Sequence, residues 1–221
     1  RFAPLGVLGL ITAAVALSGF GLFAAVGKYM LTIAGGLAIH IFIVLPLLFY
    51  LLTGIHPLKH YRAMASALAT AFATSSSNAT LPITMRCVEE NVGVSNKVTS
   101  FVLPMGATIN MDGTALYECA GVLFISQVLG IDLSIANQFT IIITALLASI
   151  GAAGIPSAGL VMIFIVTQAV GFQDADVAVI IGAMLAVDRP LDMMRTMVNI
   201  FSDSIGASVI AKSEGETLYP N

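Results

Sequence analysis

A stripe of polar residues runs along the last apolar segment of this chain, among Ala, Met, Val, Ile and Phe. The stripe comprises Asp188, Asp192, Arg195, Thr196, Asn199 and Asp203. In a helix, where successive residues are about 100° apart, these spacings place all six within an arc of about 100°. Charge at membrane depth is costly and is typically paired or lines a functional cavity. The stripe therefore predicts a binding surface on an otherwise apolar helix.

The composition places the chain in the membrane class. Of its 221 residues, 58% are hydrophobic and 10% are charged, whereas an average soluble domain has about 25% charged residues. The net charge of −3 and the lack of a basic stretch argue against nucleic-acid binding. Cys87 and Cys119 show no CxxC or His/Cys spacing, so we interpret them as packing residues rather than as a disulfide or zinc site. The predicted fold class is an all-α membrane protein.

Apolar runs and their interruptions divide the chain into helical units. Residues 2–26 and 29–52 are each long enough to span a bilayer. Residues 58–92 contain two arms too short to span, on either side of a polar tip at 74–78, which predicts a re-entrant hairpin. Residues 95–129 form a spanning unit interrupted at Gly106 and at 110–113. A second hairpin is predicted over 134–170, with a glycine-rich tip at 149–159, followed by a final helix over 175–212 and a soluble tail over 213–221.

The order of these units is typical of an inverted-repeat transporter, in which two interrupted segments are each followed by a longer charged helix. Loop charges predict the orientation, because cytoplasmic loops are enriched in Lys and Arg. The side with Lys59, Arg62 and Lys97 is predicted to be cytoplasmic, and the side with Asp132, Asp174 and Asp176 faces the opposite way. The chain begins at Arg1 and enters an apolar run at once, so we expect a C-terminal portion of a longer protein.

The serine-rich tip has two interpretations. Its hydroxyls cap a helix, or hydroxyls and free amides together receive a carboxylate. Arg195 would favour the second, because a planar guanidinium donates two parallel hydrogen bonds to a carboxylate. Asp192, one turn earlier, either neutralises Arg195 in an intrahelical ion pair or binds a substrate ammonium group. With Asn199 and the serine tip binding a second carboxylate, the functional interpretation describes an acidic amino acid.

Hard oxygen donors gather near the broken helix. They are Asn110, Asp112, Asn199 and Asp203. Oxygen-only ligation suits an alkali cation, whereas zinc or copper would call for His or Cys; the alternative is that these groups cap the break and bond to one another. Glu118 is interpreted either as a proton carrier or as a structural acid. His40 is expected to be packed or hydrogen-bonded rather than a ligand, and Asp188 to orient Arg195.

Four segments carry a resemblance to a known family. They are TSSSNATLP at 74–82, GATINMDGT at 106–114, ASIGAAGIP at 148–156 and DMMRTMVN at 192–199. In order and spacing they resemble the dicarboxylate/amino acid:cation symporters, the family of glutamate and aspartate transporters. The resemblance implies an elevator transporter with a homotrimeric scaffold. Residues 1–54 would hold a scaffold remnant and the first transport-domain helix, and residues 55–212 the transport-domain core.

The same resemblance implies site residues. Substrate would contact Ser75, Ser76, Ser77, Thr114, Ile155, Pro156, Ser157, Ala158, Gly159, Asp192, Arg195, Thr196 and Asn199. Sodium would bind the carbonyls of Gly106 and Asn199 with Asn110 and Asp203 at one site, carbonyls around Thr108, Ser149, Ile150 and Ala152 at another, and Asn110 with Asp112 at a third. Glu118 would carry a proton, as in the animal glutamate transporters. The second hairpin would act as the gate.

Departures from the family pattern refine these expectations. The first four helices of the family have no counterpart here, which removes most of the trimerisation scaffold and part of one sodium site. Archaeal members have Arg at the position of Ser75. That Arg is missing here, as it is in the animal glutamate transporters. Asp192 favours an amino acid over a dicarboxylate, and Arg195 favours an acidic substrate over a neutral one.

We therefore predict a symporter of glutamate or aspartate in the lipid bilayer of the plasma (inner) membrane, coupled to Na⁺ and, as a second candidate ion, H⁺. Its C-terminus is predicted to be cytoplasmic. The alternatives are a C4-dicarboxylate symporter and a non-transporting fragment or accessory subunit. An intramembrane hydrolase has little support, since no Ser/His/Asp arrangement is evident, and we predict that the chain is not an enzyme.

Overall fold

The computed structural model describes residues 9, 12, 21–152 and 154–219. Every secondary-structure element within these ranges is helical, which confirms the all-α class. In chain order the elements are α2 (Gly21–Ile39), the π-helical turn η1 (His40–Val44), α3 (Leu45–Thr53), α4 (Pro57–Thr74), α5 (Ser77–Cys87), the π-helical turn η2 (Val88–Val92), α6 (Asn96–Ile109), α7 (Asp112–Val128), α8 (Ile135–Gly151), α9 (Ala158–Ala169) and α10 (Asp174–Ser213).

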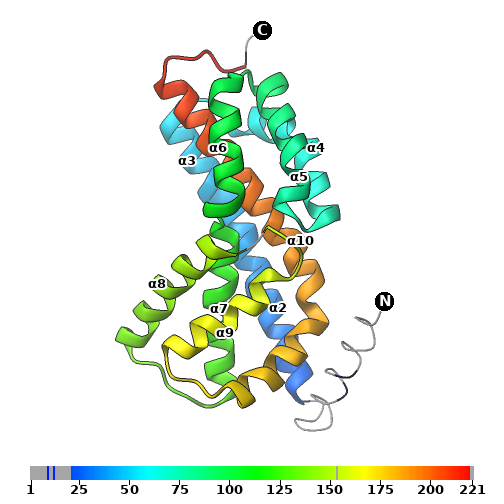
Figure 1. The fold of residues 1–221 in the computed structure, drawn as a ribbon, viewed down its shortest axis with the longest axis vertical. Coiled ribbons are helices and arrows are strands. Elements are labelled where there is room, and N and C mark those ends of the chain that lie inside the picture. Colours follow the sequence, from blue (N-terminus) through cyan, green and yellow to red (C-terminus); the bar gives the residue numbers. More distant parts are fainter. Residues whose placement is uncertain (1–8, 10–11, 13–20, 153, 220–221) are drawn as a thin grey trace.

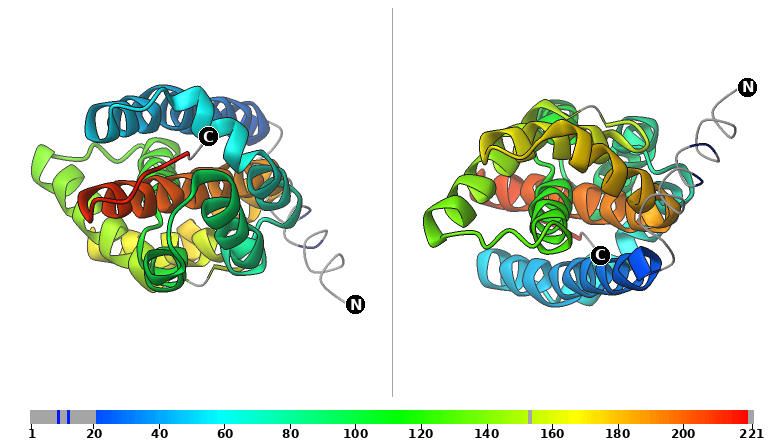
Figure 2. Two further views of the ribbon diagram at one scale, coloured as in Figure 1. Left: turned by 90° about the horizontal axis from the view of Figure 1, so that it is seen from above. Right: turned by 90° about the horizontal axis from the view of Figure 1, so that it is seen from below.

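Helix α10 is the axis of the molecule. It runs most of the length of the structure, with α3 to α6 around its C-terminal part and α2, α7 and α9 around its N-terminal part (Figure 1). Among the described helices, α8 alone makes no contact with α10. Viewed from either end, the run from α2 to α3 lies along one side of α10 (Figure 2). The polar face of α10 is therefore surrounded by other helices.

The predicted boundary between the first two apolar segments is wrong in its described part. Helix α2 begins at Gly21 and continues through Gly27 and Lys28, where we expected a break. Lys28 is exposed, so its charge costs little there. One interior glycine costs about 1 kcal/mol, which is less than the gain from burying the apolar side chains on the same face of the helix, such as Ile33 and Leu37. The rest of the predicted first span, up to residue 20, lies almost entirely outside the described residues.

Helices α2 and α3 form one continuous run through η1. The Leu45 N–H donates to the His40 carbonyl, five residues back, directly before Pro46, which has no N–H to give. Within the described part of the chain, Ala24–Thr53 is the one helical run long and apolar enough to cross a membrane by length and composition. The π turn places His40 at a local change of helical register.

The first hairpin, α4 and α5, has a shorter tip than predicted. Helix α4 ends because Ser75 adopts a left-handed conformation (φ 53°). Ser76 then caps α5, its hydroxyl accepting from the Ala79 N–H at 3.2 Å. Only Ser75 and Ser76 are non-helical, and Ser77 belongs to the first turn of α5.

The break in the third unit is also short. Asn110 and Met111 alone leave the helical conformation, between α6 and α7. The predicted interruption at Gly106 is wrong, because Gly106 is helical. A Cβ at Gly106 would lie 2.5 Å from Asp203 Oδ1, so glycine is needed there for close packing against α10 and not for a break.

The second hairpin, α8 and α9, has a longer tip. Residues 149–151 remain in α8, and 158–159 already belong to α9, which is narrower than the predicted break. Ser157 adopts a left-handed conformation (φ 60°) before α9. Ala153, inside this tip, lies outside the described residues.

Candidate functional site

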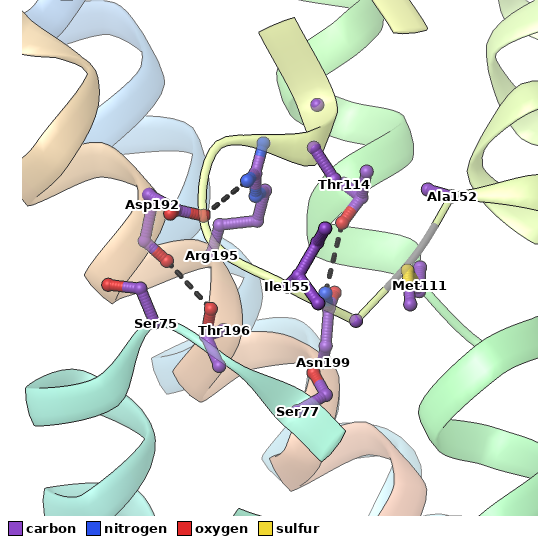
Figure 3. A pocket seen from close by; sticks show the side chains of 13 residues that line it. Ser75, Ser77, Met111, Thr114, Ala152, Ile155, Asp192, Arg195, Thr196 and Asn199 are labelled. Atoms are coloured by element: carbon purple, nitrogen blue, oxygen red, sulfur yellow. Dashed lines mark hydrogen bonds and ion pairs between the residues drawn. The ribbon is translucent and has the colours of Figure 1, made fainter. Parts of the chain in front are cut away.

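The polar stripe of α10 is buried. All six of its residues are at most 4% exposed. Part of the stripe faces a small cavity of about 10 Å³ between the two hairpin tips, the start of α7 and α10. Figure 3 shows the loop carrying Ile155 passing over Arg195, Thr196 and Asn199. The sequence therefore located the interior face of this helix correctly.

Most of the predicted substrate residues line this cavity. They are Ser75, Ser77, Thr114, Ile155, Ala158, Gly159, Asp192, Arg195, Thr196 and Asn199. Ser76, Pro156 and Ser157 are not among the lining residues, whereas Met111, Ala152 and Gly154 are. Of these three, sequence reasoning had assigned Ala152 to a cation site and had given Met111 and Gly154 no role.

Arg195 lies against the cavity with part of its hydrogen-bonding capacity unused. Its Nη2 forms an ion pair with Asp192 Oδ1, as Figure 3 shows. Its guanidinium carbon lies 4.7 Å from the centre of the Tyr117 ring, a cation–π arrangement. Its Nη1 is buried and has no hydrogen-bond partner. A buried cationic donor without a partner is a strong site for an anionic ligand.

Asp192 has both carboxylate oxygens engaged. Oδ1 is paired with Arg195, and Oδ2 accepts the Ser157 backbone N–H at 2.8 Å. The intrahelical ion pair, one of the two sequence interpretations, is therefore present in this conformation. A substrate ammonium group would share one of these oxygens or replace its partner, since a carboxylate oxygen can accept more than one hydrogen bond.

We had expected Asp188 to orient Arg195 directly, but Asp188 forms its hydrogen bonds with other residues. Its oxygens accept from the Tyr117 hydroxyl at 2.8 Å and from the Ser157 hydroxyl at 2.7 Å. Tyr117, which sequence reasoning missed, thus joins Asp188 to the guanidinium through its ring. An aromatic residue in an apolar helix carries no signal of such a role.

The two hairpin tips contact each other. The Ser76 hydroxyl donates to the Gly154 carbonyl at 2.6 Å, and the Asn78 N–H approaches the same oxygen at 3.4 Å. Ser76 therefore faces the opposite tip instead of the cavity. The buried hydroxyl of Ser75 has no partner. The cavity is consequently bounded by two serines of the first hairpin, one of which is free to bond a ligand.

Asn199 and Thr196 complete the cavity wall. The Asn199 side chain donates to Thr114 Oγ1 at 3.0 Å and accepts the Gly113 N–H at 2.9 Å. A Cβ at Gly113 would lie 2.9 Å from this same amide oxygen, so the start of α7 and α10 touch here. The Thr196 hydroxyl donates to the Asp192 carbonyl at 2.9 Å.

The predicted cation ligands near the helix break form one hydrogen-bonded cluster. Asn110 Nδ2 donates to Asp203 Oδ1 at 2.9 Å and to Ser202 Oγ at 2.9 Å. Ser202, which sequence reasoning missed, in turn donates to Asp112 Oδ1 and to the Asn199 carbonyl, both at 2.9 Å. The Gly106 carbonyl accepts the Asn110 N–H at 2.9 Å. The cluster is rich in oxygen, as an alkali cation requires.

His40 adjoins this cluster. Its Nε2 lies 2.7 Å from Asp112 Oδ2, and the two side chains are 22% and 26% exposed. This histidine is hydrogen-bonded, as expected from its isolated position in an apolar helix. Within the described ranges, no group of three or more His, Cys, Asp and Glu side chains is arranged to hold a metal ion.

The second predicted sodium site consists of backbone carbonyls, so its side chains need not contact one another. The hydroxyls of Thr108 and Ser149 donate to helix carbonyls of their own elements, those of Met105 and Leu146. Thr108 and Ile150 are exposed, whereas Ser149 and Ala152 are buried. Helices α6 and α8 nevertheless contact each other.

Glu118 is fully buried in α7, and both of its carboxylate oxygens lack hydrogen-bond partners. An ionised carboxylate without a partner is unfavourable in such a place. The alternative of a structural hydrogen-bonding acid would need a bonded partner, which these two oxygens lack.

Buried charges enclosed by two helical hairpins and a broken helix define a class, the secondary transporters of membranes. Residues 1–213 match the sodium:dicarboxylate symporter family, and the chain belongs to that family. It is accordingly an integral membrane protein. The family description is of symporters, which agrees with the prediction that the chain is not an enzyme.

Individual relatives are similar over nearly the whole chain. Excitatory amino acid transporter 3 of Mus musculus is 50% identical over 212 residues, covering 96% of this chain and 40% of the relative. Excitatory amino acid transporter 1 of Mus musculus is 49% identical over 211 residues, covering 95% and 38%. An excitatory amino acid transporter of Caenorhabditis elegans is 51% identical over 182 residues, covering 82% and 35%. The chain thus spans about 40% or less of the length of these relatives.

Proposed function

We propose that this chain forms the substrate- and cation-binding core of a sodium-coupled symporter for acidic amino acids, glutamate or aspartate. The observation that carries the proposal is the free, buried Nη1 of Arg195, which lies against this small cavity. The similarity to excitatory amino acid transporters supports it.

In the proposed complex, substrate exchanges partners with the resting ion pair. The side-chain carboxylate takes Arg195 through Nη1 and Nη2, and the ammonium group takes the Asp192 oxygen that Arg195 releases. The α-carboxylate reaches the free hydroxyl of Ser75 and the polar wall at Asn199. Each buried charge keeps an opposite partner throughout, which avoids the large penalty of leaving one uncompensated.

Sodium is proposed to occupy the cluster of Asn110, Asp112, Asn199 and Asp203, together with the carbonyl of Gly106. In this conformation the Asn110 amide fills the position beside Asp203 Oδ1 at 2.9 Å. A bound Na⁺ would displace the amide hydrogens and draw on the amide oxygen instead. The second site, at Thr108, Ser149, Ile150 and Ala152, and a proton on Glu118 complete the proposed coupling ions.

The proposed orientation places the C-terminus in the cytoplasm of a cell whose plasma membrane holds the protein. Lys59 neighbours His60, which bonds Tyr219, and Lys97 is close to Ser95, which bonds Glu216. The basic residues therefore lie at the same end as the tail, while Asp174 begins α10 at the other end (Figure 1). The division at residue 54, elevator motion and a homotrimer stay proposals that rest on the family resemblance.

The test is uptake into proteoliposomes containing the purified protein. We expect an inward sodium gradient to drive uptake of labelled aspartate, and Arg195→Ala to weaken aspartate binding by about 3–5 kcal/mol, since it breaks a buried ion pair. Arg86→Ala is the matched control, because Arg86 is 75% exposed and pairs with Glu90 alone on the helix surface. Unchanged aspartate affinity in Arg195→Ala would refute the assigned role.

A C4-dicarboxylate symporter is the second candidate. The specific observation in its favour is that each oxygen of Asp192 already has a partner, so an ammonium group would share an occupied oxygen or displace its partner in this conformation. Competition by succinate distinguishes the two: we expect succinate to bind much more weakly than aspartate. Equal binding of the two, unaffected by Asp192→Asn, would favour the dicarboxylate function.

A further inference from the structure

The C-terminal tail folds back onto the structure. We expected residues 213–221 to be a soluble tail, but the described part, 214–219, returns over the start of α6 (Figure 1). Leu218 and Tyr219 pack against the hydrophobic core. The tail therefore makes specific contacts that the function proposed above does not use.

Glu216 binds the N-terminus of α6 with both carboxylate oxygens. The Ser95 N–H donates to Oε2 at 2.8 Å, and the Ser95 hydroxyl donates to Oε1 at 2.6 Å. Ser95 is the N-cap residue of α6, yet its own side chain caps nothing in that helix. In a capping box, a Glu or Gln three residues after the N-cap accepts the N-cap N–H. That position is Val98 here, so the tail supplies the missing carboxylate.

Tyr219, three residues after Glu216, connects the tail to the first hairpin. The Tyr219 hydroxyl lies 2.6 Å from Nδ1 of the fully buried His60, whose Nε2 lies 2.8 Å from Ser204 Oγ on α10. The Tyr219 N–H donates to the Val92 carbonyl at 2.6 Å. Tyr219 has a left-handed backbone (φ 55°), which is unfavourable for a residue with a side chain. These contacts hold it there.

The two helices joined by Glu216 are those that carry the candidate cation ligands. Gly106 lies ten residues after the start of α6, and Asp203 lies ten residues before the end of α10. At 1.5 Å per residue, each is about 15 Å from the tail. Helices α6 and α10 pack together between these points, with Gly106 against Asp203. Helices α6 and α10 are thus connected at two places, by the tail at one end and by the contact at the cation cluster about 15 Å away.

We propose that Glu216 is a positioning residue for the cation site: by holding Ser95 it fixes the register of α6 against α10, and with it the separation between Gly106, Asn110 and Asp203. Helical segments transmit a shift along their axis because their hydrogen bonds keep the rise per residue constant. The role at the cation site rests on the proposed sodium coupling, whereas the register of α6 does not.

The test compares Glu216→Ala with Glu214→Ala in the purified protein. Glu214 is an exposed acid two residues earlier, so it controls for the loss of charge in the tail. We expect Glu216→Ala to raise the sodium concentration for half-maximal aspartate binding about two- to thirtyfold, the range for substitutions that alter coupling between sites. Glu216→Gln keeps one acceptor oxygen and should give an intermediate value. Aspartate affinity at saturating sodium should not change.

Hydrogen exchange provides the readout that is independent of sodium. Glu216→Ala should speed exchange of the amides of residues 106–113 about three- to tenfold, a change equivalent to about one ordinary hydrogen bond. Adding Ser95→Ala to the Glu216→Ala protein should change the rate little further. Faster exchange confined to residues 93–98, with the sodium midpoint unchanged, would overturn the proposal, since the contact would then be local. If the wild-type protein binds no sodium, the proposed function fails, and exchange at 106–113 alone decides whether Glu216 sets the register of α6.

Discussion

The two hairpin tips reach the same cavity but are held in different ways. The first tip is two residues long and is followed by α5, whose N-terminus is capped by Ser76. Both arms of this hairpin, α4 and α5, contact α10. The second tip is longer, Ser157 provides no side-chain cap to α9, and α8 makes no contact with α10. The first hairpin therefore packs against α10 through both of its arms, whereas the second packs against α10 through α9 alone and its other arm, α8, packs against α6 and α7.

The attachment of the second tip depends on the charged residues of the site itself. Ser157 donates its N–H to Asp192 and its hydroxyl to Asp188. Any ligand that competes for Asp192 also competes with this contact. The difference between the hairpins thus couples ligand binding to the position of the second tip, while the first tip stays fixed.

The largest expected effect comes from Asp192→Asn. This change removes the countercharge of buried Arg195 and weakens the bond from Ser157, so we expect a loss of about 3–5 kcal/mol in aspartate binding. Isothermal titration measures it, with Asp132→Asn as the control because Asp132 is exposed. If aspartate bound equally well, the second tip would not be held by the substrate site, and the contrast between the hairpins would disappear.

Ser157→Ala should release the second tip without touching the first. It removes a hydrogen bond to a carboxylate, which contributes about 1.5–3 kcal/mol. The labelling rate of Ile155→Cys by a membrane-impermeant maleimide reports opening of this tip, and should rise. Ser157→Gly should open it less than Ser157→Ala, because glycine adopts the left-handed backbone freely.

Thr140→Ala, on the exposed surface of α8, serves as the control for labelling. A labelling rate that is the same in Ser157→Ala and in Thr140→Ala would show that the second tip is closed by other contacts.

Ser76→Ala should have a smaller effect, because the first hairpin has other support. It removes the N-cap of α5, which contributes about 1 kcal/mol, and the bond to the Gly154 carbonyl. We expect a modest fall in thermal stability and a small rise in Ile155→Cys labelling. A labelling rate above that of Ser157→Ala would show that the second tip is held mainly by its contact with Ser76 and not by the bond from Ser157 to Asp188.

Sequence alone located the elements because their signals are local. The spacing of Asp188 to Asp203 fixes one helix face, and a polar run such as 74–78 interrupts an apolar helix wherever it occurs. Most of the residues that the resemblance assigned to substrate line the cavity. These features depend on periodicity and residue type, which the sequence displays directly.

Partners from distant segments were not visible in the sequence. Tyr117 and Ser202 look like ordinary residues of an apolar helix, and only packing brings them to Arg195 and Asp112. Gly106 suggested a break, whereas its role is to let α6 approach Asp203. The tail was expected to be soluble, and no residue near Glu216 in the sequence indicates its contact. Its partner lies 121 residues earlier in the chain.

The smallest expected effect is a pH dependence of thermal stability that arises from Glu216 in the tail and not from either hairpin tip. The hydrogen bonds from the side chain and backbone of Ser95 lower the pKa of Glu216 below its ordinary value. The ionised form is therefore favoured in the folded protein, and the stabilisation is complete above the unfolded pKa of about 4.3. As the pH falls through the lowered pKa, Glu216 is protonated and the stabilisation is lost. Thermal melting as a function of pH should show a small loss of stability on the acid side in wild type that is absent in Glu216→Ala.

Because neither hairpin tip contains Glu216, labelling of Ile155→Cys should show no matching difference between the two proteins. A parallel change in the labelling rate would mean that the tail also sets the position of the second hairpin.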